Sequence, residues 1–517
     1  MNKKKTTYDF EDLFVFEVAN NHQGDVNHGL SIIDMCSDVA KKYNIRAAIK
    51  IQLRQLETFI HPNYREADDP SHIKRFLSTQ LTNEQFHILI DHARKKNLIT
   101  MATPFDEESV DLMEEMNFEI TKIGSCSAND WPLLEKVSEK NNPVIISTGG
   151  LNISDIDKIV SFCDHRGLDF ALNHCVSIYP TPPNLCELNQ IDVMRSRYPG
   201  VTIGWSTHED PNDSDIIMVA YAKGARIFEK HVGYINKKVP SLNAYSAERS
   251  QIEKWIEKCL KAKELCGSDK NPERDEEEIE SLNSLRRGVY AIENIEDGEE
   301  ITKDNVFFAM PYQKGQLYSG IWQENISSKT SIRKNDPIKM SALKIPIPPN
   351  ELIIQHSLHE IKGMLNHANI KLGPNFQVEY SHHYGIPNFR KVGAVFITIV
   401  NRSYCKKLVV QLPGQSHPAH FHKKKEETFS VLSGVLEVTI DGYEQKLNPG
   451  EQALVQSGLW HSFSTDTGVI FEELSSTHFN DDSFYRDKKI NSGSRTHRKT
   501  YTDNWGRFTL EDKITIQ

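Results

Sequence analysis

The stretch "RIFEKHVGY", residues 226–234, begins as an apolar run and ends in three ionisable residues, Glu229, Lys230 and His231. Charge at the end of a strand that reads as buried is unusual, because burying an ionised group without a partner costs free energy. We expect such an ending where the ends of several strands meet in one shared pocket.

Seven similar runs precede this stretch, and amphipathic segments with apolar residues at helical spacing separate them. The runs are LFVFEV (13–18), RAAIKI (46–51), LITMA (98–102), EITKIG (119–124), PVIIS (143–147), DFALN (169–173) and VTIGW (201–205). Near-continuous apolar strands indicate a parallel sheet that is buried on both faces. Eight strands alternating with helices over about 250 residues predict an α/β fold, a (β/α)8 TIM barrel, with a doubly wound open sheet as the alternative.

A polar residue ends or follows each run, which is where a barrel places its active site. These residues are Glu17, Lys50 with Gln52, Thr103, Lys122 with Ser125, Ser147, His174, Ser206 with His208, and His231. The two lysines and the hydroxyls predict a cradle for a phosphate or carboxylate.

Two histidines from adjacent strands, His208 and His231, are candidate ligands of a divalent metal that polarises a carbonyl, with Mn²⁺, Co²⁺ and Zn²⁺ all open. Glu17 is a candidate general base, or a residue that orients a water molecule. A Schiff-base aldolase that uses Lys50 or Lys122 is the competing enzyme class.

Eight ordered motifs lie at these strand ends: FEVANNHQGD, AAIKIQ, ATPFDEESVD, KIGS, VIISTGG, HCVSIYPTPP, GWSTHED and FEKH. The series resembles the sialic acid synthase family, and "LRRGVYAIENIEDGEEITKDNVFFAMP" is similar to the small SAF (antifreeze-like) domain of that family. The resemblance covers roughly residues 10–345. It implies a transferase of carbohydrate biosynthesis that condenses phosphoenolpyruvate with an aldose, with C–O cleavage, giving phosphate and a 3-deoxy-2-ulosonic (nonulosonic-type) acid.

The resemblance also implies roles for individual residues. His208 and His231 would hold a divalent metal, with Mn²⁺ favoured, and Glu17 would handle the attacking water. Gln52 and Tyr179 would contact the aldose, and the SAF domain would cover the active site of the partner chain in a homodimer. The residues implied to bind phosphoenolpyruvate are Lys50, Thr103, Lys122, Ser125, Ser147, Ser177 and Ser206.

The sugar side departs from the family pattern at three places. Ser127 stands where the family has a Glu, Leu242 or Asn243 stands where it has a sugar-contacting Asp, and Met310 replaces an Arg that precedes a Pro. A site built for buried hydroxyls loses several kcal/mol without such partners. The sequence therefore predicts an aldose other than N-acetylmannosamine as the acceptor.

The C-terminal part combines short alternating strands with Gly turns, which predicts a β jelly roll. His420, His422, Glu427 and His461 have a spacing that resembles the cupin metal motif, so a second divalent metal is expected there. The surrounding sequence faintly resembles sugar-isomerase cupins, so this domain is expected to bind or isomerise a related sugar. His417 and His478 are expected to be polar surface residues.

Three domains follow: a synthase barrel over residues 1–270, a SAF domain over 284–345 and a cupin domain over 350–517. The net charge of −10 argues against nucleic acid as a partner, and no apolar run reaches the roughly 20 residues of a membrane span. Eight scattered cysteines suggest reduced thiols and a cytoplasmic location. Two alternatives remain open: a sugar-binding regulatory protein that has lost catalysis, and a bifunctional enzyme whose cupin is a sugar isomerase.

Overall fold

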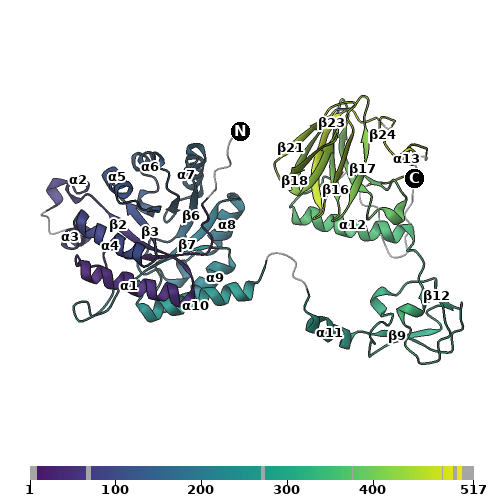
Figure 1. The fold of residues 1–517 in the computed structure, drawn as a ribbon, viewed down its shortest axis with the longest axis horizontal. Helices are drawn as coiled ribbons and strands as arrows, with labels where there is room; N and C mark the ends of the chain where they lie inside the picture. The colour runs from purple at the N-terminus through teal and green to yellow at the C-terminus, as the bar shows by residue number, and fades with distance from the viewer. Residues whose placement is uncertain are drawn as a thin grey trace. The chain divides into compact units, whose positions relative to one another are not determined.

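The computed structural model describes residues 8–65, 71–268, 274–374, 376–479, 481–492 and 498–503. The chain divides into two compact units, Met1–Pro272 and Glu273–Gln517, and each is described by itself (Figure 1). Within the described ranges, no helix is long and apolar enough to cross a bilayer.

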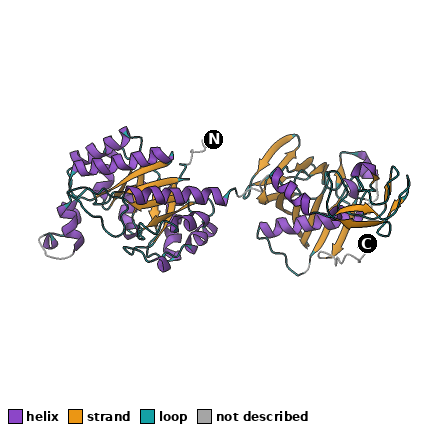
Figure 2. Ribbon diagram, turned by 90° about the horizontal axis from the view of Figure 1, so that it is seen from below, coloured by secondary structure: helices purple, strands orange, loops and turns teal. Residues whose placement is uncertain are grey.

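The first unit is a closed barrel of eight parallel strands, which confirms the barrel and excludes the open sheet. Helices surround the strands on the outside (Figure 2). The strands are β1 (Leu13–Glu17), β2 (Arg46–Leu53), β3 (Ile99–Pro104), β4 (Ile120–Ile123), β5 (Val144–Ser147), β6 (Phe170–Cys175), β7 (Thr202–Thr207) and β8 (Ile227–His231).

Local signals in the sequence start and stop the outer helices. The side chain of Asn152 accepts a hydrogen bond from the backbone of Asp155 and caps α7, which ends at Gly167 in the left-handed conformation. Thr82 and Gln85 form a capping box at the start of α4. The helices are α1 (Val26–Tyr43), α2 (Leu56–Phe59), α3 (Ser71–Ser78), α4 (Asn83–Lys95), α5 (Glu107–Glu115), α6 (Trp131–Ser138), α7 (Ile153–Arg166), α8 (Asn189–Arg197), α9 (Ile216–Ala222) and α10 (Arg249–Cys266).

The inside of the barrel is layered, because alternate residues of every strand point inward. The layer nearer the amino ends of the strands is an apolar cluster that includes Leu13, Ala48, Met101, Ile120, Ile145 and Ile227. Two residues further along five of these strands the inward position is polar, at Lys50, Thr103, Lys122, Ser147 and Glu229, whereas on β1 the polar residue is Glu17, after the apolar Val15. The fold thus supports a buried polar layer on an apolar floor.

The second unit begins with α11 (Glu276–Leu285) and a small β-rich region that falls within the expected SAF segment. Its strands form a pair, β11–β9, and a three-stranded sheet, β10–β12–β13, around a core that includes Val289, Ile301 and Ile338. The strands are β9 (Gly288–Ala291), β10 (Glu300–Ile301), β11 (Val306–Ala309), β12 (Ile326–Ser328) and β13 (Leu343–Lys344).

The remainder is an antiparallel sandwich of a seven-stranded and a five-stranded sheet, which confirms the β-rich cupin domain (Figure 1). Helix α12 (Asn350–His367) packs Ile354, Ile361 and Leu365 against the seven-stranded sheet. The other elements are β14 (Gln377–Ser381), β15 (Ala394–Asn401), β16 (Tyr404–Gln411), β17 (Ser416–Phe421), β18 (Glu427–Gly434), β19 (Leu436–Ile440), β20 (Tyr443–Leu447), β21 (Gln452–Val455), β22 (His461–Ser464), β23 (Val469–Ser476), β24 (Phe484–Tyr485), α13 (Lys488–Ser492) and β25 (Lys499–Asp503).

Candidate active site and candidate metal centre

The carboxyl ends of the barrel strands bring the predicted catalytic residues to one level. Glu17 on β1 is in register with Lys50 on β2 and with His231 on β8. The Lys50 ammonium forms an ion pair with the Glu17 carboxylate, and its Nζ lies 3.5 Å from Oγ1 of Thr103. Lys122 donates to Oγ of Ser147 at 2.6 Å. Five predicted site residues therefore lie in two buried groups, which Glu229 joins into one network.

Glu229 joins the two lysines, and the sequence analysis gave it no role. Its carboxylate lies 2.8 Å from Nζ of Lys50 and 3.7 Å from Nζ of Lys122. Burial works against the charged carboxylate, but the two ammonium groups outweigh it and lower the pKa of Glu229 to about 2. The signal was present in the sequence: Glu229 and His231 are two residues apart on one strand, so they share the inner face of the barrel.

The charges of the two lysines respond differently to this arrangement. Burial opposes the charge of Lys50, yet the carboxylates of Glu17 and Glu229 overcome it and raise its pKa. Burial lowers the pKa of Lys122, and the more distant Glu229 does not fully compensate. Lys122 is therefore the lysine whose charged form an added anion would stabilise more.

Lys230, the third ionisable residue at the end of β8, lies on the opposite face of this strand from Glu229 and His231. It points out of the barrel, where its Nζ lies 3.1 Å from Oε1 of the equally buried Glu209. His174 also points outward, and its Nε2 contacts the carbonyl oxygen of Cys186 at 2.9 Å. The expectation that His174 faces the mouth of the barrel with the other strand-end polar residues is therefore wrong. Asn173 occupies the inner position of β6 instead, in register with Ser147.

The two barrel histidines lie side by side, with ring centroids 5.3 Å apart. Nδ1 of His208 contacts the carbonyl oxygen of Val176 at 2.8 Å, which leaves Nε2 free to bind a metal. Burial, with smaller effects of neighbouring groups, lowers the pKa of both His208 and His231 to about 3, so both rings are neutral at physiological pH. Neutral, oriented imidazoles are what a divalent cation requires, and these residues therefore fit one.

Three of the serines expected to bind phosphoenolpyruvate lie around this network. Oγ of Ser125 accepts a hydrogen bond from the backbone of Gly149 at 3.0 Å. A Cβ at position 149 would lie 2.6 Å from Oγ of Ser177 and 2.7 Å from Oγ of Ser125, so the absence of a side chain lets both hydroxyls approach. Ser206 is in register with Glu229 on the neighbouring strand.

The two residues expected to contact the aldose lie at the rim of this group of side chains. Nε2 of Gln52 lies 3.4 Å from Oε2 of Glu17. The exposed ring of Tyr179 is 4.2 Å from the ring of His208, and Tyr245, which the sequence analysis missed, stacks edge-on against His231 at 5.1 Å. The rim on the histidine side is therefore aromatic.

A second cluster of ligating side chains lies inside the jelly roll. His420, His422 and His461 have one potential ligand atom each, all within 4.8 Å of one another. Each ring directs Nδ1 to a backbone carbonyl, of Pro418 at 3.0 Å, of Asp482 at 2.6 Å and of Leu459 at 3.2 Å respectively. The three Nε2 atoms are thus left for a common ligand, which is the arrangement a bound divalent metal needs.

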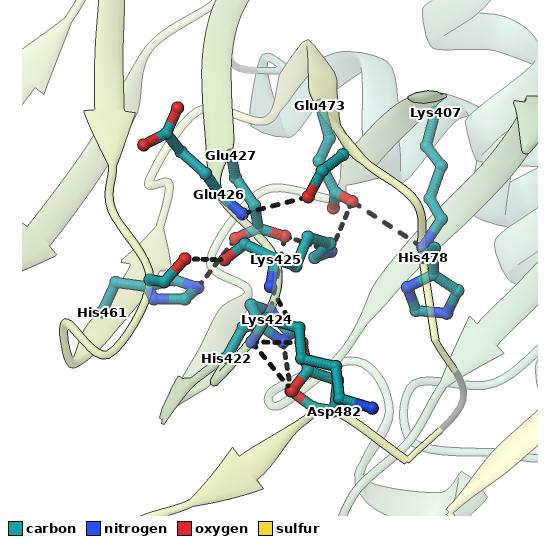
Figure 3. Close-up of polar contacts among 12 residues, drawn as sticks. Lys407, His422, Lys424, Lys425, Glu426, Glu427, His461, Glu473, His478 and Asp482 are labelled. Atoms are coloured by element: carbon teal, nitrogen blue, oxygen red, sulfur yellow. Dashed lines mark hydrogen bonds and ion pairs between the residues drawn. The ribbon is translucent and has the colours of Figure 1, made fainter. Parts of the chain in front are cut away.

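Glu427, the fourth expected ligand, lies beside this triad but is shared with a cation (Figure 3). Its carboxylate is 3.4 Å from Nε2 of His422, 3.2 Å from Nε2 of His461, and in an ion pair with Lys425. Lys425 also lies 2.8 Å from Oε1 of Glu473. A metal and Lys425 therefore approach the same carboxylate from two sides.

A single carboxylate fixes the loop that carries Lys425. Asp482 accepts hydrogen bonds from the backbone N–H groups of Lys423, Lys424 and Lys425 at 3.0–3.2 Å, and its own carbonyl oxygen contacts His422 (Figure 3). Asp482 thus positions one candidate metal ligand, His422, and the residues leading into Glu427.

The expectation that His417 and His478 are surface residues is wrong. Only 4% of His417 is exposed; its ring stacks on Phe463 and lies 4.8 Å from that of His420. Both histidines line the same small cavity as His420 and His422, together with Lys407, Lys499 and Tyr485 among others. A bulge in β17 between His417 and His420 lets the rings of these two residues, three positions apart, both face the interior. A strict two-residue alternation does not predict this.

Comparison with known proteins agrees with this architecture. The sequence profile of the NeuB family matches residues 38–271, and that of a cupin domain matches residues 407–472. A Methanocaldococcus jannaschii protein, MJ1065, is 31% identical over 57% of this chain and 84% of its own length. The chain belongs to the NeuB family.

Two further NeuB-like proteins cover the same part of the chain. A Chromobacterium violaceum protein named for spore coat polysaccharide biosynthesis is 42% identical, and its crystal structure superposes with a TM-score of 0.63 over 65% of this chain and all of that chain. The N,N'-diacetyllegionaminic acid synthase of Campylobacter jejuni is 26% identical over 58% of this chain and 90% of its own length.

Proposed function

We propose that the barrel of this NeuB-family chain condenses phosphoenolpyruvate with an aldose to give a 3-deoxy-2-ulosonic acid and phosphate. The observation that carries the proposal is the pair of buried lysines, Lys50 and Lys122, beside two neutral histidines at the carboxyl ends of the strands. The legionaminic, pseudaminic and N-acetylneuraminate-9-phosphate synthases among its relatives carry names consistent with that reaction class.

The roles of the chain's own residues follow from their positions. Lys50 and Lys122, with the hydroxyls of Thr103, Ser147 and their neighbours, bind the carboxylate and phosphate of phosphoenolpyruvate. C3 of phosphoenolpyruvate attacks the aldehyde carbon, water adds at C2, and phosphate leaves with cleavage of the C–O bond. Glu17, which forms an ion pair with Lys50, orients that water and accepts its proton. A divalent cation such as Mn²⁺, bound by His208 and His231, would polarise the aldehyde oxygen.

Three parts of the proposal concern the rest of the chain. We propose that Gln52 and Tyr179 contact the aldose, and that the region around 284–345 acts as a SAF domain over the active site of the partner in a homodimer. For the cupin we propose a second divalent metal at His420, His422 and His461, in a cavity that binds or isomerises a related sugar. The buried, mixed-charge lining of that cavity favours a hydroxyl-rich ligand.

The test is phosphate release from phosphoenolpyruvate with Mn²⁺ across a panel of aldoses, with mass spectrometry of the product. We expect one aldose class to yield a product that contains all its carbons plus the three of pyruvate. His231→Ala should reduce turnover by orders of magnitude and remove the barrel metal, whereas His420→Ala should leave phosphate release intact. Sugar binding without phosphate release from any aldose would refute the synthase and favour a binding protein.

A further inference from the structure

Arg54 lies at the same mouth as the predicted site and has no role in the reaction described above. It follows β2 directly, and its position continues the alternation of Lys50 and Gln52, which both face the inside of the barrel. One NH2 group donates to Oε1 of Gln52 at 2.7 Å. Since Nε2 of Gln52 lies 3.4 Å from Glu17, Arg54 is linked to the catalytic network through one side chain.

Two aromatic rings hold the guanidinium group in place. Its central carbon lies 3.7 Å from the ring centroid of Phe105, which follows β3, and 4.0 Å from that of Phe76 on α3. Stacking of this kind favours Arg, because the planar guanidinium covers the rings while its N–H groups remain in the plane and can donate. The rings thus fix the plane in which Arg54 can receive a partner.

No carboxylate within the described residues is paired with this cation. Asp106 is close enough to act on Arg54 electrostatically, but its oxygens accept hydrogen bonds from the backbone of Gln55 at 2.9 Å and of Ser109 at 2.7 Å. Glu17 is engaged by Lys50. Nε of Arg54 is buried without a hydrogen-bond partner, and burial lowers the pKa of the guanidinium to about 10. A half-buried, oriented cation whose Nε is fully buried and unpartnered is costly unless a ligand supplies the charge.

We propose that Arg54 binds an anionic group, a phosphate or a carboxylate, on a carbon of the acceptor aldose away from the aldehyde. The inference rests on the proposed condensation and narrows its acceptor. The unpartnered Nε and the fixed plane of the guanidinium suit Arg54 to a negatively charged sugar rather than a neutral one.

The experiment compares matched substrates. Aldoses are supplied as twins that differ only in charge: hexosamines with and without a 6-phosphate, and hexoses with their uronic acids, so that the two pairs distinguish phosphate from carboxylate. For the wild type we expect kcat/KM to be at least tenfold higher for the anionic twin of one pair. Arg54→Gln should remove this preference mainly through KM, and Arg54→Lys should keep part of it.

A control and a binding measurement keep the result interpretable. Arg46→Gln removes the same charge from the opposite end of β2, where Arg46 stacks on Tyr8 and pairs with Asp9, and it should leave the preference unchanged. Calorimetric titration of the protein saturated with phosphoenolpyruvate, with EDTA added to prevent turnover, should show anionic-twin binding that Arg54→Gln weakens at least tenfold. Equal use of both twins by the wild type, or an equal loss for both in Arg54→Gln, would overturn the role of Arg54. Anionic-twin binding that depends on Arg54 without any phosphate release would instead overturn the condensation itself.

Discussion

Replacing Glu229 by Gln should show how strongly this carboxylate balances the two lysines. With an effective dielectric constant of about 20, its attraction amounts to about 4.5 kcal/mol for Lys122 at 3.7 Å and about 6 kcal/mol for Lys50 at 2.8 Å. The carboxylate also regains hydration in the unfolded state, so the net loss on breaking such a buried pair is about 3–5 kcal/mol. We therefore expect Glu229→Gln to lower the unfolding temperature of the barrel by roughly 6–20 °C.

Anions should reverse part of that loss. In Glu229→Gln the ammonium of Lys122 lacks its nearest carboxylate, so phosphate or phosphoenolpyruvate should bind more tightly than in the wild type. A ligand at one hundred times its Kd adds about 2.7 kcal/mol, enough to restore roughly half to nine-tenths of the lost stability. Differential scanning calorimetry with and without phosphate measures both effects, with the barrel transition identified as the one that phosphate shifts.

The matched control is Glu209→Gln, which breaks the buried pair with Lys230 outside the barrel. This variant should lose comparable stability but gain no additional response to phosphate. If Glu229→Gln were as stable as the wild type, or if both variants responded to phosphate alike, Glu229 would not be the counter-ion of the lysine pair.

Three further outcomes follow from the charges described above. Asp482→Ala should free the loop before Glu427 and weaken metal retention by the cupin about 10–100-fold, measured as metal content after dialysis; full retention would contradict its positioning role. Lys425→Met should destabilise the metal-free cupin but enlarge the thermal shift caused by added Zn²⁺ or Mn²⁺, because the cation no longer competes for Glu427; an unchanged shift would argue against that competition. Burial lowers the pKa of His208 and His231 to about 3, below the 6.5 of an unfolded histidine, so the unfolded state takes up more protons in acid. The free energy of unfolding of the metal-free barrel should therefore be highest above about pH 6.5. It should fall toward pH 3 by at most about 1.4 kcal/mol per pH unit for each histidine. Hydrogen-exchange protection factors of β7 and β8 that stay constant between pH 7 and pH 5 would contradict this.

The strand pattern was enough to predict the barrel, because a parallel sheet buried on both faces leaves near-continuous apolar runs that few other folds produce. It also placed Lys50 and His231 at one end of the barrel, since the chain direction fixes which end of each strand is which. Glu229 was given no role because the sequence shows that it shares the inner face with His231, but not which charges it meets there. Its contacts with both lysines appear only in the closed barrel.

In the cupin, local spacing predicted the candidate metal ligands, but the contacts that position them come from residues distant in the sequence. The spacing of His420 and His422 predicted a shared ligand, and their rings do converge with that of His461. The burial of His417 and the hydrogen bonds from the loop at Lys425 to the Asp482 carboxylate could not be predicted. They depend on a bulge and on a contact between residues almost 60 positions apart, neither of which has a local signature.

The arrangement of charge at the barrel mouth connects the donor site with the acceptor site. Lys50 and Lys122 are balanced by Glu17 and Glu229, so this part of the site is close to neutral before substrate arrives. Phosphoenolpyruvate then adds negative charge next to Lys122, whose charge is the less well compensated of the two. Arg54 lies outside this balance, separated from it by a neutral amide. Its charge is therefore not needed for phosphoenolpyruvate, and an anionic acceptor is the substrate that would use it.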